Sequence, residues 1–517
     1  MNTDVMIVGY GPVGKLLAIQ VGRRGHSVVV IDRNDADYPL PRAVTHCSDF
    51  ARIIQSVGLA PDTIPEITEP YDDLYYWHDN QGRTLVEVDW SGVGESGWYN
   101  VYFFHQPELE RRLDELVDRL PSITVLRGWE AISLSQSTDT ATVAARSMRT
   151  GGEMTVTAAW VVGADGANSK VREWAGLPWH NEGYFFDWLV VDVKPLSGVE
   201  FPHVAKQNCD FRRPTTMVPG GPGRRRWEFM RLPHEAKETL NRTEKAWELL
   251  GDFGLTPQNS KLERHTVYTF QACWATRWRE GRVILAGDAA HLMPPFAGQG
   301  LGAGVRDVMN LSWKLDAVLR GIASEQLIDT YEAERMHHAV AFVRFSTELG
   351  KVVCITDPTR AAERDDRMIA DWGAAMRATT PPRPGLGPGV HAGSYGGHLA
   401  RQGRVRVPDG SLRWFDDAFG GPGALIARSA ASLIGLDKQI RSSLAALDID
   451  LVALSGSATA NVTVVEDADG TYGAWLDELH ADLVLVRPDF HLYGSGSHDD
   501  AAKLATGFLG HFGAQTS

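Results

Sequence analysis

The sequence predicts an α/β fold in which a domain built on a parallel sheet is interrupted by an antiparallel sheet and followed by a C-terminal α/β module. Three observations predict it. Residues 3–32 follow the order strand, glycine turn, helix, strand, which is the opening unit of a parallel sheet. From about residue 184 to 270 the pattern changes to the short alternating strands of an antiparallel sheet. The segment Thr379–Gly389 is dense in Pro and Gly and marks a domain boundary.

The length of 517 residues predicts about three domains, and the composition is that of an ordinary globular protein. Hydrophobic residues at 43% and charged residues at 22% supply a sizeable core. The net charge of −14 argues against a nucleic-acid partner, because phosphates would be repelled. The basic run at 223–227 fits either a solvated hairpin turn or a local basic pocket. No apolar stretch approaches the roughly 18 residues that span a bilayer, so no membrane partner is expected.

Cysteine usage and the N-terminus indicate a cytoplasmic protein. Met1 leads directly into the first strand without a signal peptide. The four cysteines form no CxxC pair and have no metal-ligand spacing, so we expect reduced, mostly buried thiols and no metal site. A catalytic cysteine remains the alternative for one of them. A monomer and a homodimer are both compatible with the sequence.

The first unit predicts a Rossmann-like nucleotide site. In the turn Gly9–Gly14, Gly9 permits the tight turn, Gly11 lets the backbone approach a pyrophosphate, and Gly14 lets the helix pack on the strand. The helix that begins at Pro12 and Val13 presents unpaired amides to that anion. Asp32 ends the second strand, eighteen residues beyond Gly14, and is placed to bind a ribose hydroxyl, with Arg33 beside it.

The remaining elements follow from periodicity and turn residues. We expect helices at 12–24, 42–58, 107–120, 298–320 and 324–352. We expect strands at 131–145, 153–158, 159–163, 185–193, 215–218, 226–231 and 267–272.

A second glycine-rich segment, Gly281–Gly304, follows a strand and runs into a long helix. Asp288 fits either a plain turn residue or a carboxylate that accepts from sugar hydroxyls. A Gly-rich helix start offers amides to an anion or carbonyl, which suits a flavin, whose reduced ring is negative near its pyrimidine edge. Such a helix end contributes about 0.3–1 kcal/mol when exposed and up to ~2 kcal/mol when partly buried. Together the two glycine segments predict bound FAD rather than a transient nicotinamide alone.

The motifs resemble those of a known family, the class A FAD-dependent aromatic hydroxylases (the para-hydroxybenzoate hydroxylase and phenol hydroxylase superfamily). The three fingerprints are the Gly9–Gly14 turn, the Asp165-Gly166 turn and Gly287-Asp288 with Pro295 and Gly300; they cover roughly residues 1–350. Within the superfamily, the chain is similar to 3-(3-hydroxyphenyl)propionate hydroxylases. The shared stretches lie at 38–43, beginning with Tyr38, and at 55–59, 226–230, 285–294 and 306–315. The run at 483–489 also recurs in relatives with a thioredoxin-like C-terminal domain.

The resemblance implies a glutathione-reductase-type FAD-binding domain made of residues 1–70, 101–183 and 270–380. The inserted substrate domain, an antiparallel sheet, takes residues 71–100 and 184–269. Residues 386–517 resemble a thioredoxin-like domain, but without CxxC a redox role for it is in doubt.

The resemblance also assigns roles along the cofactor. Asp32 would bind the adenosine ribose, Arg42 would lie along the pyrophosphate or ribityl chain, and Gln106 would contact the flavin chain. For Arg42 the alternative is a surface ion pair, and for Gln106 an ordinary helix start. The remaining positions would be Asp165 and Gly166 at a turn serving FAD and NAD(P)H, Asp288 on the ribityl chain, Pro295 at the reactive edge, and Gly298, Gly300 and Leu301 at the pyrimidine carbonyls.

The family chemistry implied is hydroxylation of a small phenol: NADH or NADPH reduces FAD, O2 forms a flavin C4a-hydroperoxide, and an electron-rich ring attacks it. Full ionisation of a phenol at pH 7 costs ~4 kcal/mol, so a base would help. His46, on the segment that passes the flavin, is the candidate base, and a packing histidine is the alternative. Candidate substrate residues are Trp188, Trp227 and Phe229, with Arg213 (or Arg212 or Arg226) for a substrate carboxylate.

Other reaction classes stay open. A tailoring hydroxylase of polycyclic aromatic or polyketide metabolites shares these fingerprints, so a phenolic acid, a related phenol and a larger ring system are all possible substrates. A flavin halogenase would carry a Trp-x-Trp motif, which this sequence lacks. A non-hydroxylating FAD oxidoreductase and a non-catalytic flavoprotein complete the alternatives.

Overall fold

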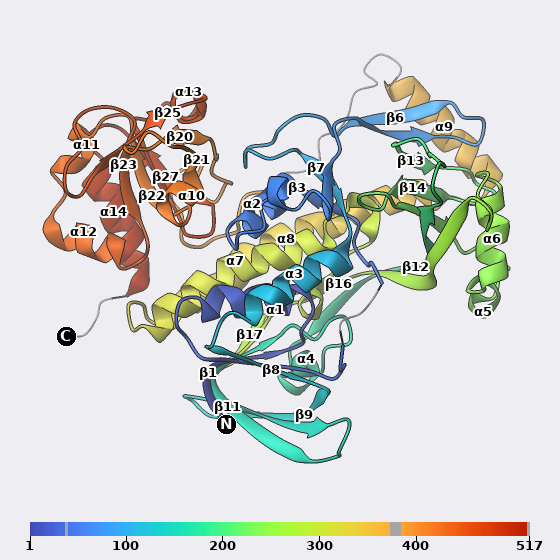
Figure 1. The fold of residues 1–517 in the computed structure, drawn as a ribbon, viewed down its shortest axis with the longest axis horizontal. Coiled ribbons are helices and arrows are strands. Elements are labelled where there is room, and N and C mark those ends of the chain that lie inside the picture. The colour runs from blue at the N-terminus through green and yellow to red at the C-terminus, as the bar shows by residue number, and fades with distance from the viewer. Residues whose placement is uncertain (37–39, 373–383, 514–517) are drawn as a thin grey trace.

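The computed structural model describes residues 1–36, 40–372 and 384–513 (Figure 1). Tyr38 and the first part of the Thr379–Gly389 boundary lie outside the described residues. Within them the chain has a mixed α/β architecture with two eight-stranded sheets, one five-stranded sheet and two three-stranded sheets. Among the described residues, no helix combines the length and the apolar content that crossing a bilayer requires.

The first sheet carries the N-terminal unit. Its strand order is β17-β18-β11-β1-β2-β8, with β10 and β9 continuing from β11. Strands β18, β11, β1, β2 and β8 are parallel, and the apolar runs of β1, β2 and β18 are buried, whereas β8 at the edge is only partly buried. The strands are β1 (Asn2–Val8), β2 (Val28–Asp32), β8 (Ile123–Arg127), β9 (Trp129–Gln136), β10 (Ala141–Ser147), β11 (Glu153–Gly163), β17 (Arg279–Glu280) and β18 (Val283–Leu285).

Helices α1, α3 and α7 pack together over this sheet, with α8 beside α7. Helix α1 (Pro12–Gly22) is buried along almost its whole length, because α3 (Gln106–Val117) and α7 (Gly300–Leu319) both cover it. In Figure 1, α7 and α8 (Gln326–Val353) run across the middle of the molecule, between the second sheet in green and the C-terminal module in orange and red. The short α4 (Lys170–Trp174) follows the Asp165 turn.

The second sheet has the order β19-β16-β12-β15-β14-β13-β5-β6. The long strands β12 and β16 form its centre and begin earlier or run longer than the sequence predicts. Helices α5 (Lys237–Leu240) and α6 (Thr243–Gly251) cover one of its faces. The strands are β5 (Leu74–His78), β6 (Thr84–Asp89), β12 (Trp179–Pro195), β13 (Ala205–Asn208), β14 (Thr215–Pro219), β15 (Arg225–Met230), β16 (Ser260–Ala275) and β19 (His291–Leu292).

Residues 42–58 differ from the single helix expected. The structure has an extended segment that ends in strand β3 (Thr45–Cys47), followed by helix α2 (Ser48–Gln55). β3 pairs with β7 (Val101–Phe104), which also pairs with β4 (Thr68–Pro70). The β-branched Val44 and Thr45 suit an extended backbone, and pairing with a distant strand cannot be seen in local periodicity.

The C-terminal module contains the five-stranded sheet β24-β23-β22-β26-β27 and the small sheet β21-β20-β25. Its strands are β20 (Arg404–Arg406), β21 (Leu412–Trp414), β22 (Ala424–Ala427), β23 (Asp450–Ala453), β24 (Thr463–Val464), β25 (Glu466–Asp467), β26 (Leu483–Val486) and β27 (Leu492–Gly496). Its helices are α10 (Phe415–Phe419), α11 (Ala431–Ile434), α12 (Lys438–Ala445), α13 (Thr471–Glu478) and α14 (Ala501–Leu509). Helix α9 (Pro358–Trp372), absent from the sequence prediction, precedes this module and contacts β6.

Candidate active site

The first glycine turn brings strand β1 and helix α1 into contact. Gly9 has φ +106°, and a Cβ on it would lie 2.3 Å from the carbonyl oxygen of Ala164. A Cβ on Gly14 would lie 2.1 Å from the carbonyl oxygen of Gly9. Helix α1 begins at Pro12 without a side-chain cap, so its first amides remain available. The turn therefore forms a cradle for an anion that only glycine permits at these positions.

Asp32 lies at the end of β2, beside this turn. Its Oδ2 accepts the Tyr10 amide at 2.8 Å and its Oδ1 accepts the Asn34 amide at 2.8 Å. Arg33 is exposed next to it. Because Asp32 is only half-buried, its carboxylate can also accept a ligand hydroxyl.

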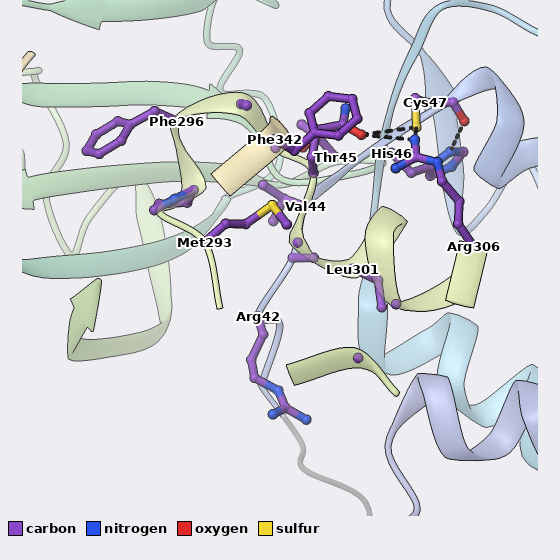
Figure 2. A pocket seen from close by; sticks show the side chains of 18 of the residues that line it. Arg42, Val44, Thr45, His46, Cys47, Met293, Phe296, Leu301, Arg306 and Phe342 are labelled. Carbon is purple, nitrogen blue, oxygen red and sulfur yellow. Dashed lines mark hydrogen bonds between the residues drawn. The ribbon is translucent and has the colours of Figure 1, made fainter. Parts of the chain in front are cut away.

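A cavity of about 720 Å³ lies between the first sheet, the start of α7 and the second sheet (Figure 2). It is lined by residues from both glycine segments and from the segment that leads into β3. His398, Leu399 and His491 of the C-terminal module also line it. Residues from five parts of the chain therefore meet at one place. The cofactor candidates on the wall are Gly11, Pro12, Val13, Arg42, Gln106, Gly166, Asp288, Pro295, Gly298, Gly300 and Leu301.

The second glycine segment forms one wall of the cavity. Pro295 begins a single 3-10 turn, Pro295–Ala297, and Gly298 follows with φ +63°. Helix α7 then starts at Gly300, and its N-cap residue Gln299 makes no side-chain capping bond. The amides at this helix end are therefore open toward the cavity, with the partial positive charge of a twenty-residue helix behind them.

Asp307 holds the second glycine segment in place through hydrogen bonds, a role that the sequence did not indicate. Its buried Oδ2 accepts the Gly287 amide at 3.0 Å and lies 2.8 Å from Nε2 of His291. Its Oδ1 accepts from Nε of Arg335 at 3.0 Å. The signal in the sequence is an acid about two turns inside a long apolar helix, where a charge needs partners.

Arg42 and Gln106 lie on another wall of the cavity. The Oε1 of Gln106 accepts the Ala43 amide at 2.7 Å, and its Nε2 donates to Glu110 at 2.7 Å. The Nη2 atom of Arg42 lies 3.9 Å from where a Gly11 Cβ would lie. Asp288 is exposed on the cavity wall, where desolvation by the surrounding protein raises its pKa and the positive charge of Arg42 opposes that shift. A ligand that donates to Asp288 would stabilise its charged form.

Asp165 lies outside the cavity wall, although its neighbours Ala164, Gly166 and Ala167 are part of it. Its Oδ1 accepts from Ser169 Oγ at 2.5 Å, and its Oδ2 accepts the Lys170 amide at 2.7 Å. The carboxylate thus caps the turn that enters α4. In this structure Asp165 therefore shapes the loop that carries these wall residues.

His46 occupies a packing position. Its ring lies 4.7 Å from that of Phe50 and 4.8 Å from that of Tyr102, and Nε2 lies 3.0 Å from Thr68 Oγ1. Nδ1 lies 3.3 Å from the carbonyl oxygen of Cys47. Burial lowers the pKa of His46 to about 4. With both nitrogens engaged and the charged form disfavoured, this ring does not suit a base for a phenol, and the packing alternative fits it.

Arg306, Asp49 and Cys47 form a charged corner of the cavity that sequence reasoning did not single out. The Arg306 guanidinium pairs with Asp49 and donates from Nη2 to Cys47 Sγ at 3.0 Å (Figure 2). Asp49 and desolvation keep Cys47 as a neutral thiol, since burial raises its pKa to about 12. A thiol in that state is a poor nucleophile, so the corner gives no sign of a catalytic cysteine.

The expected substrate residues divide between two faces of the second sheet. Trp227 and Phe229 pack with Leu249 and Leu250 of α6, on the face turned away from the cavity. Arg213 pairs with Glu235 at 2.6 Å, also outside the wall. These three expectations are therefore corrected. Trp188 is fully buried behind two wall residues, with ring distances of 6.0 Å to Phe270 and 5.6 Å to Phe296.

The face that does line the cavity consists of the alternate residues. Arg226 and Glu228 of β15 point into it, beside Val190, Thr216, Tyr268 and Phe270 from neighbouring strands. The period of two in 226–230 predicts that alternate residues share one face of the strand. It does not predict which of the two faces lines the cavity.

These features fit FAD. The glycine cradle would hold its pyrophosphate, the carboxylates of Asp32 and Asp288 would accept sugar and ribityl hydroxyls, and the start of α7 would face the flavin ring. Fold and site together fit a flavoprotein whose cavity opens onto one face of the second sheet.

Comparisons with known proteins agree with this definition. A family model described as an FAD binding domain matches residues 2–346, and one described as the HcaD C-terminal domain matches residues 397–511. The chain is 34% identical to a probable NADH-specific resorcinol 4-hydroxylase of Rhodococcus jostii over 97% of this chain and 93% of the relative. It is 33% identical to a 3-(3-hydroxy-phenyl)propionate/3-hydroxycinnamic acid hydroxylase of Burkholderia cenocepacia, over 98% and 95%.

Solved structures show the same fold. The flavin-dependent monooxygenase PieE, in complex with FAD and substrate, superposes with a TM-score of 0.82 at 20% identity over 99% of both chains. OxyS anhydrotetracycline hydroxylase from Streptomyces rimosus gives 0.76 at 24% identity, over 99% of this chain and 100% of that one. The chain belongs to the FAD-dependent aromatic hydroxylases, monooxygenases that use FAD, NAD(P)H and O2.

Proposed function

We propose that this enzyme hydroxylates small uncharged phenols of the resorcinol type, with NADH as the electron donor. The observation that carries the proposal is the charge of the cavity on its sheet side. Arg226 faces the cavity but is paired with Asp192 through two hydrogen bonds, of 2.7 and 3.0 Å. The neighbouring Glu228 adds a negative charge when ionised. A substrate carboxylate would meet an acid and an already neutralised arginine, whereas a phenolic hydroxyl would meet an acceptor.

The other cations on the wall support this choice. Arg306 pairs with Asp49, and the guanidinium of Arg42 lies near Gly11, although the Arg42 carbonyl oxygen contacts Arg226. The relatives' names include both an uncharged phenol and phenolic acids as substrates. The distribution of charge in this cavity favours the uncharged phenol.

Bound FAD would accept electrons from NAD(P)H, react with O2 and supply one oxygen atom to the ring. In the proposed site, residues of the chain bind FAD and orient it. Gly9, Gly11 and Gly14 take the pyrophosphate, Asp32 the ribose and Asp288 the ribityl chain. The amides of Gly300 and Leu301 face the pyrimidine edge, and Pro295 with Phe296 excludes water beside the reacting ring.

We propose the domain division that the sequence suggests, with residues 386–517 as a thioredoxin-like module. Its support is the mixed sheet of β22 to β27 and the position of His398 and His491 on the cavity wall. No cysteine lies beyond Cys354, so the module closes and stiffens the site rather than exchanging thiols. The reduced cysteines are in keeping with the cytoplasm.

A substrate screen with FAD-loaded enzyme tests the proposal. NADH oxidation, O2 uptake and product mass are measured with resorcinol, phenol, 3-hydroxybenzoate and 3-(3-hydroxyphenyl)propionate. We expect kcat/KM to be at least tenfold higher for the uncharged phenols, with a product heavier by one oxygen atom. A preference for the carboxylated phenols, or NADH oxidation that yields peroxide without hydroxylated product from any phenol, would contradict it.

A further inference from the structure

Glu228 lies in the middle of the sheet wall, on the side that faces the cavity. It belongs to β15 and pairs in register with Val190 of β12 and Thr216 of β14, both of which line the same cavity. The two neighbours of Glu228 in sequence, Trp227 and Phe229, point to the opposite face. Its side chain is only 12% exposed, so the carboxylate is largely shielded from solvent and lies on the cavity wall.

The partners of Glu228 do not satisfy its carboxylate. The nearest cation is Arg226, whose Nη1 lies 3.8 Å from Oε1. That nitrogen already donates to the carbonyl oxygen of Arg42 at 2.6 Å, while Nε and Nη2 donate to Asp192. Within the described chain, no side-chain hydrogen bond reaches the Glu228 carboxylate. A buried acceptor in this state calls for a donor from a ligand.

The surroundings of Glu228 raise the pKa of its carboxyl group. Burial raises its pKa, the positive charge of Arg226 lowers it, Asp192 of β12 raises it and Arg264 of β16 lowers it. Tyr75 of β5 also faces this carboxylate, and burial raises the pKa of that phenol well above its usual value. A carboxylate with a raised pKa is closer to the pKa of a phenol, so it draws a phenolic proton more strongly than an exposed one.

We propose that Glu228 accepts the hydroxyl hydrogen of the substrate phenol and acts as the base that activates the ring for oxygen transfer. The inference rests on the proposed function and adds the residue that recognises the substrate hydroxyl. As the ring carbon forms its bond to one atom of O2, the O–O bond breaks and the phenolic O–H proton moves to Glu228. The other oxygen atom leaves as water: NAD(P)H supplies the two electrons, and the hydrogens of the water come from the reduced cofactor and from the proton that the ring carbon releases. The ring carbon then loses its hydrogen as a proton, and Glu228 returns its own.

The position of Thr216 extends the site for a second hydroxyl. Its Oγ1 donates to Oε1 of Gln207 at 2.6 Å, and both residues line the cavity next to Glu228. A ring with two hydroxyls in a meta relation can place one on Glu228 and direct the other toward this polar pair. A carboxylate in place of the first hydroxyl would be repelled.

The test compares Glu228→Gln with Glu235→Gln. Glu235 lies in the same domain, is 14% exposed and pairs with Arg213 outside the cavity, so it is matched in burial but not in position. Both FAD-loaded variants are first compared with wild type by FAD content and by circular dichroism. The readout is the rate of product formation with resorcinol between pH 6.5 and 10, and with a series of phenols whose own pKa falls from about 10 to 7.

We expect E228Q to lose roughly 100-fold or more of the hydroxylation rate at pH 7, within the range for a general base. The loss should shrink as pH approaches the phenol's pKa and should be small for the most acidic phenols, because those substrates arrive already ionised. E235Q should remain within twofold of wild type at every pH. Glu228→Asp should retain more activity than E228Q.

Wild-type rates in E228Q would overturn the inference, as would a loss that is the same at every pH and for every phenol. If the wild-type enzyme itself hydroxylates none of the phenols, both the proposed function and the role of Glu228 fail. If wild type hydroxylates them and E228Q matches it, only the role of Glu228 fails. The two failures are thus distinguishable.

Discussion

Arg487 of the C-terminal module forms a two-pronged ion pair with Glu334 of α8. Its Nη1 lies 2.8 Å from Oε1 of Glu334 and its Nη2 lies 2.8 Å from Oε2, and both side chains are fully buried. Lys314 of α7 adds a third charge at 2.8 Å from Oε2, and Asp489 binds the other side of Arg487. The C-terminal module is thereby fixed to the two helices that carry the flavin end of the cavity.

Breaking this pair should destabilise the whole chain. Arg487→Ala leaves Glu334 and Asp489 buried without their guanidinium, at a cost of about 3–5 kcal/mol. The free energy of unfolding is measured by urea titration followed by circular dichroism. Arg406→Ala is the control, because its partner Glu466 is 66% exposed and such pairs contribute about 0–1 kcal/mol. Equal losses in the two variants would show that the buried pair does not fix the module.

His46 predicts a pH dependence of stability. Its pKa is about 4 in the folded state and about 6.5 when unfolded, so the unfolded chain binds the proton more tightly. Stability is therefore full above pH 6.5 and falls as pH decreases from 6.5 toward 4. Between pH 7 and pH 5 this single group removes about 2 kcal/mol. His46→Phe should lose about 2 kcal/mol less over that interval, measured by urea unfolding.

The exposed His234 provides the control for this pH dependence. His234→Phe should follow the wild-type profile. An H46F profile parallel to wild type would mean that the His46 ring is not neutral in the folded protein.

Gly14 should be essential for FAD retention. A Cβ at this position would lie 2.1 Å from the carbonyl oxygen of Gly9, so Gly14→Ala must push α1 away from the turn. We expect purified G14A to contain less than a tenth of the wild-type FAD, read from the ratio of flavin to protein absorbance. Gly251→Ala, where no atom lies within 4 Å of the added Cβ, should keep its FAD. A G14A protein with normal FAD content would refute the tight-packing account of this glycine.

Asp288 should contribute to FAD affinity as an acceptor for ribityl hydroxyls. Hydrogen bonds to a charged group contribute about 1.5–3 kcal/mol, so Asp288→Ala should raise the Kd for FAD about 10- to 100-fold. The Kd is measured by flavin fluorescence on adding FAD to the apoprotein. Asp139→Asn changes a side chain that is 87% exposed and distant from Asp288 in the sequence, so it should leave the Kd unchanged. An unchanged Kd in D288A would place the ribityl chain elsewhere.

The sequence predicted the local parts of the fold well. The unit of β1, α1 and β2, the two long helices α7 and α8, and the strands β14 and β15 lie within a few residues of their expected positions. Each of these follows from a period or a turn that is encoded within about twenty residues. The helix expected at 42–58 was wrong in its first half, because β3 forms only by pairing with β7, which lies over fifty residues away.

The sequence by itself predicted two glycine turns that could serve one dinucleotide cofactor, since Gly9, Gly14 and the start of α7 would act through local backbone geometry. The tertiary structure alone decided which side chains meet in the cavity. A period of two places Trp227 and Phe229 on one face of the sheet and Arg226 and Glu228 on the other, but only the packing of α6 shows which face is turned away. Likewise, the charge of the site depends on partners that are distant in sequence, as when Asp192 neutralises Arg226 and leaves Glu228 to the substrate.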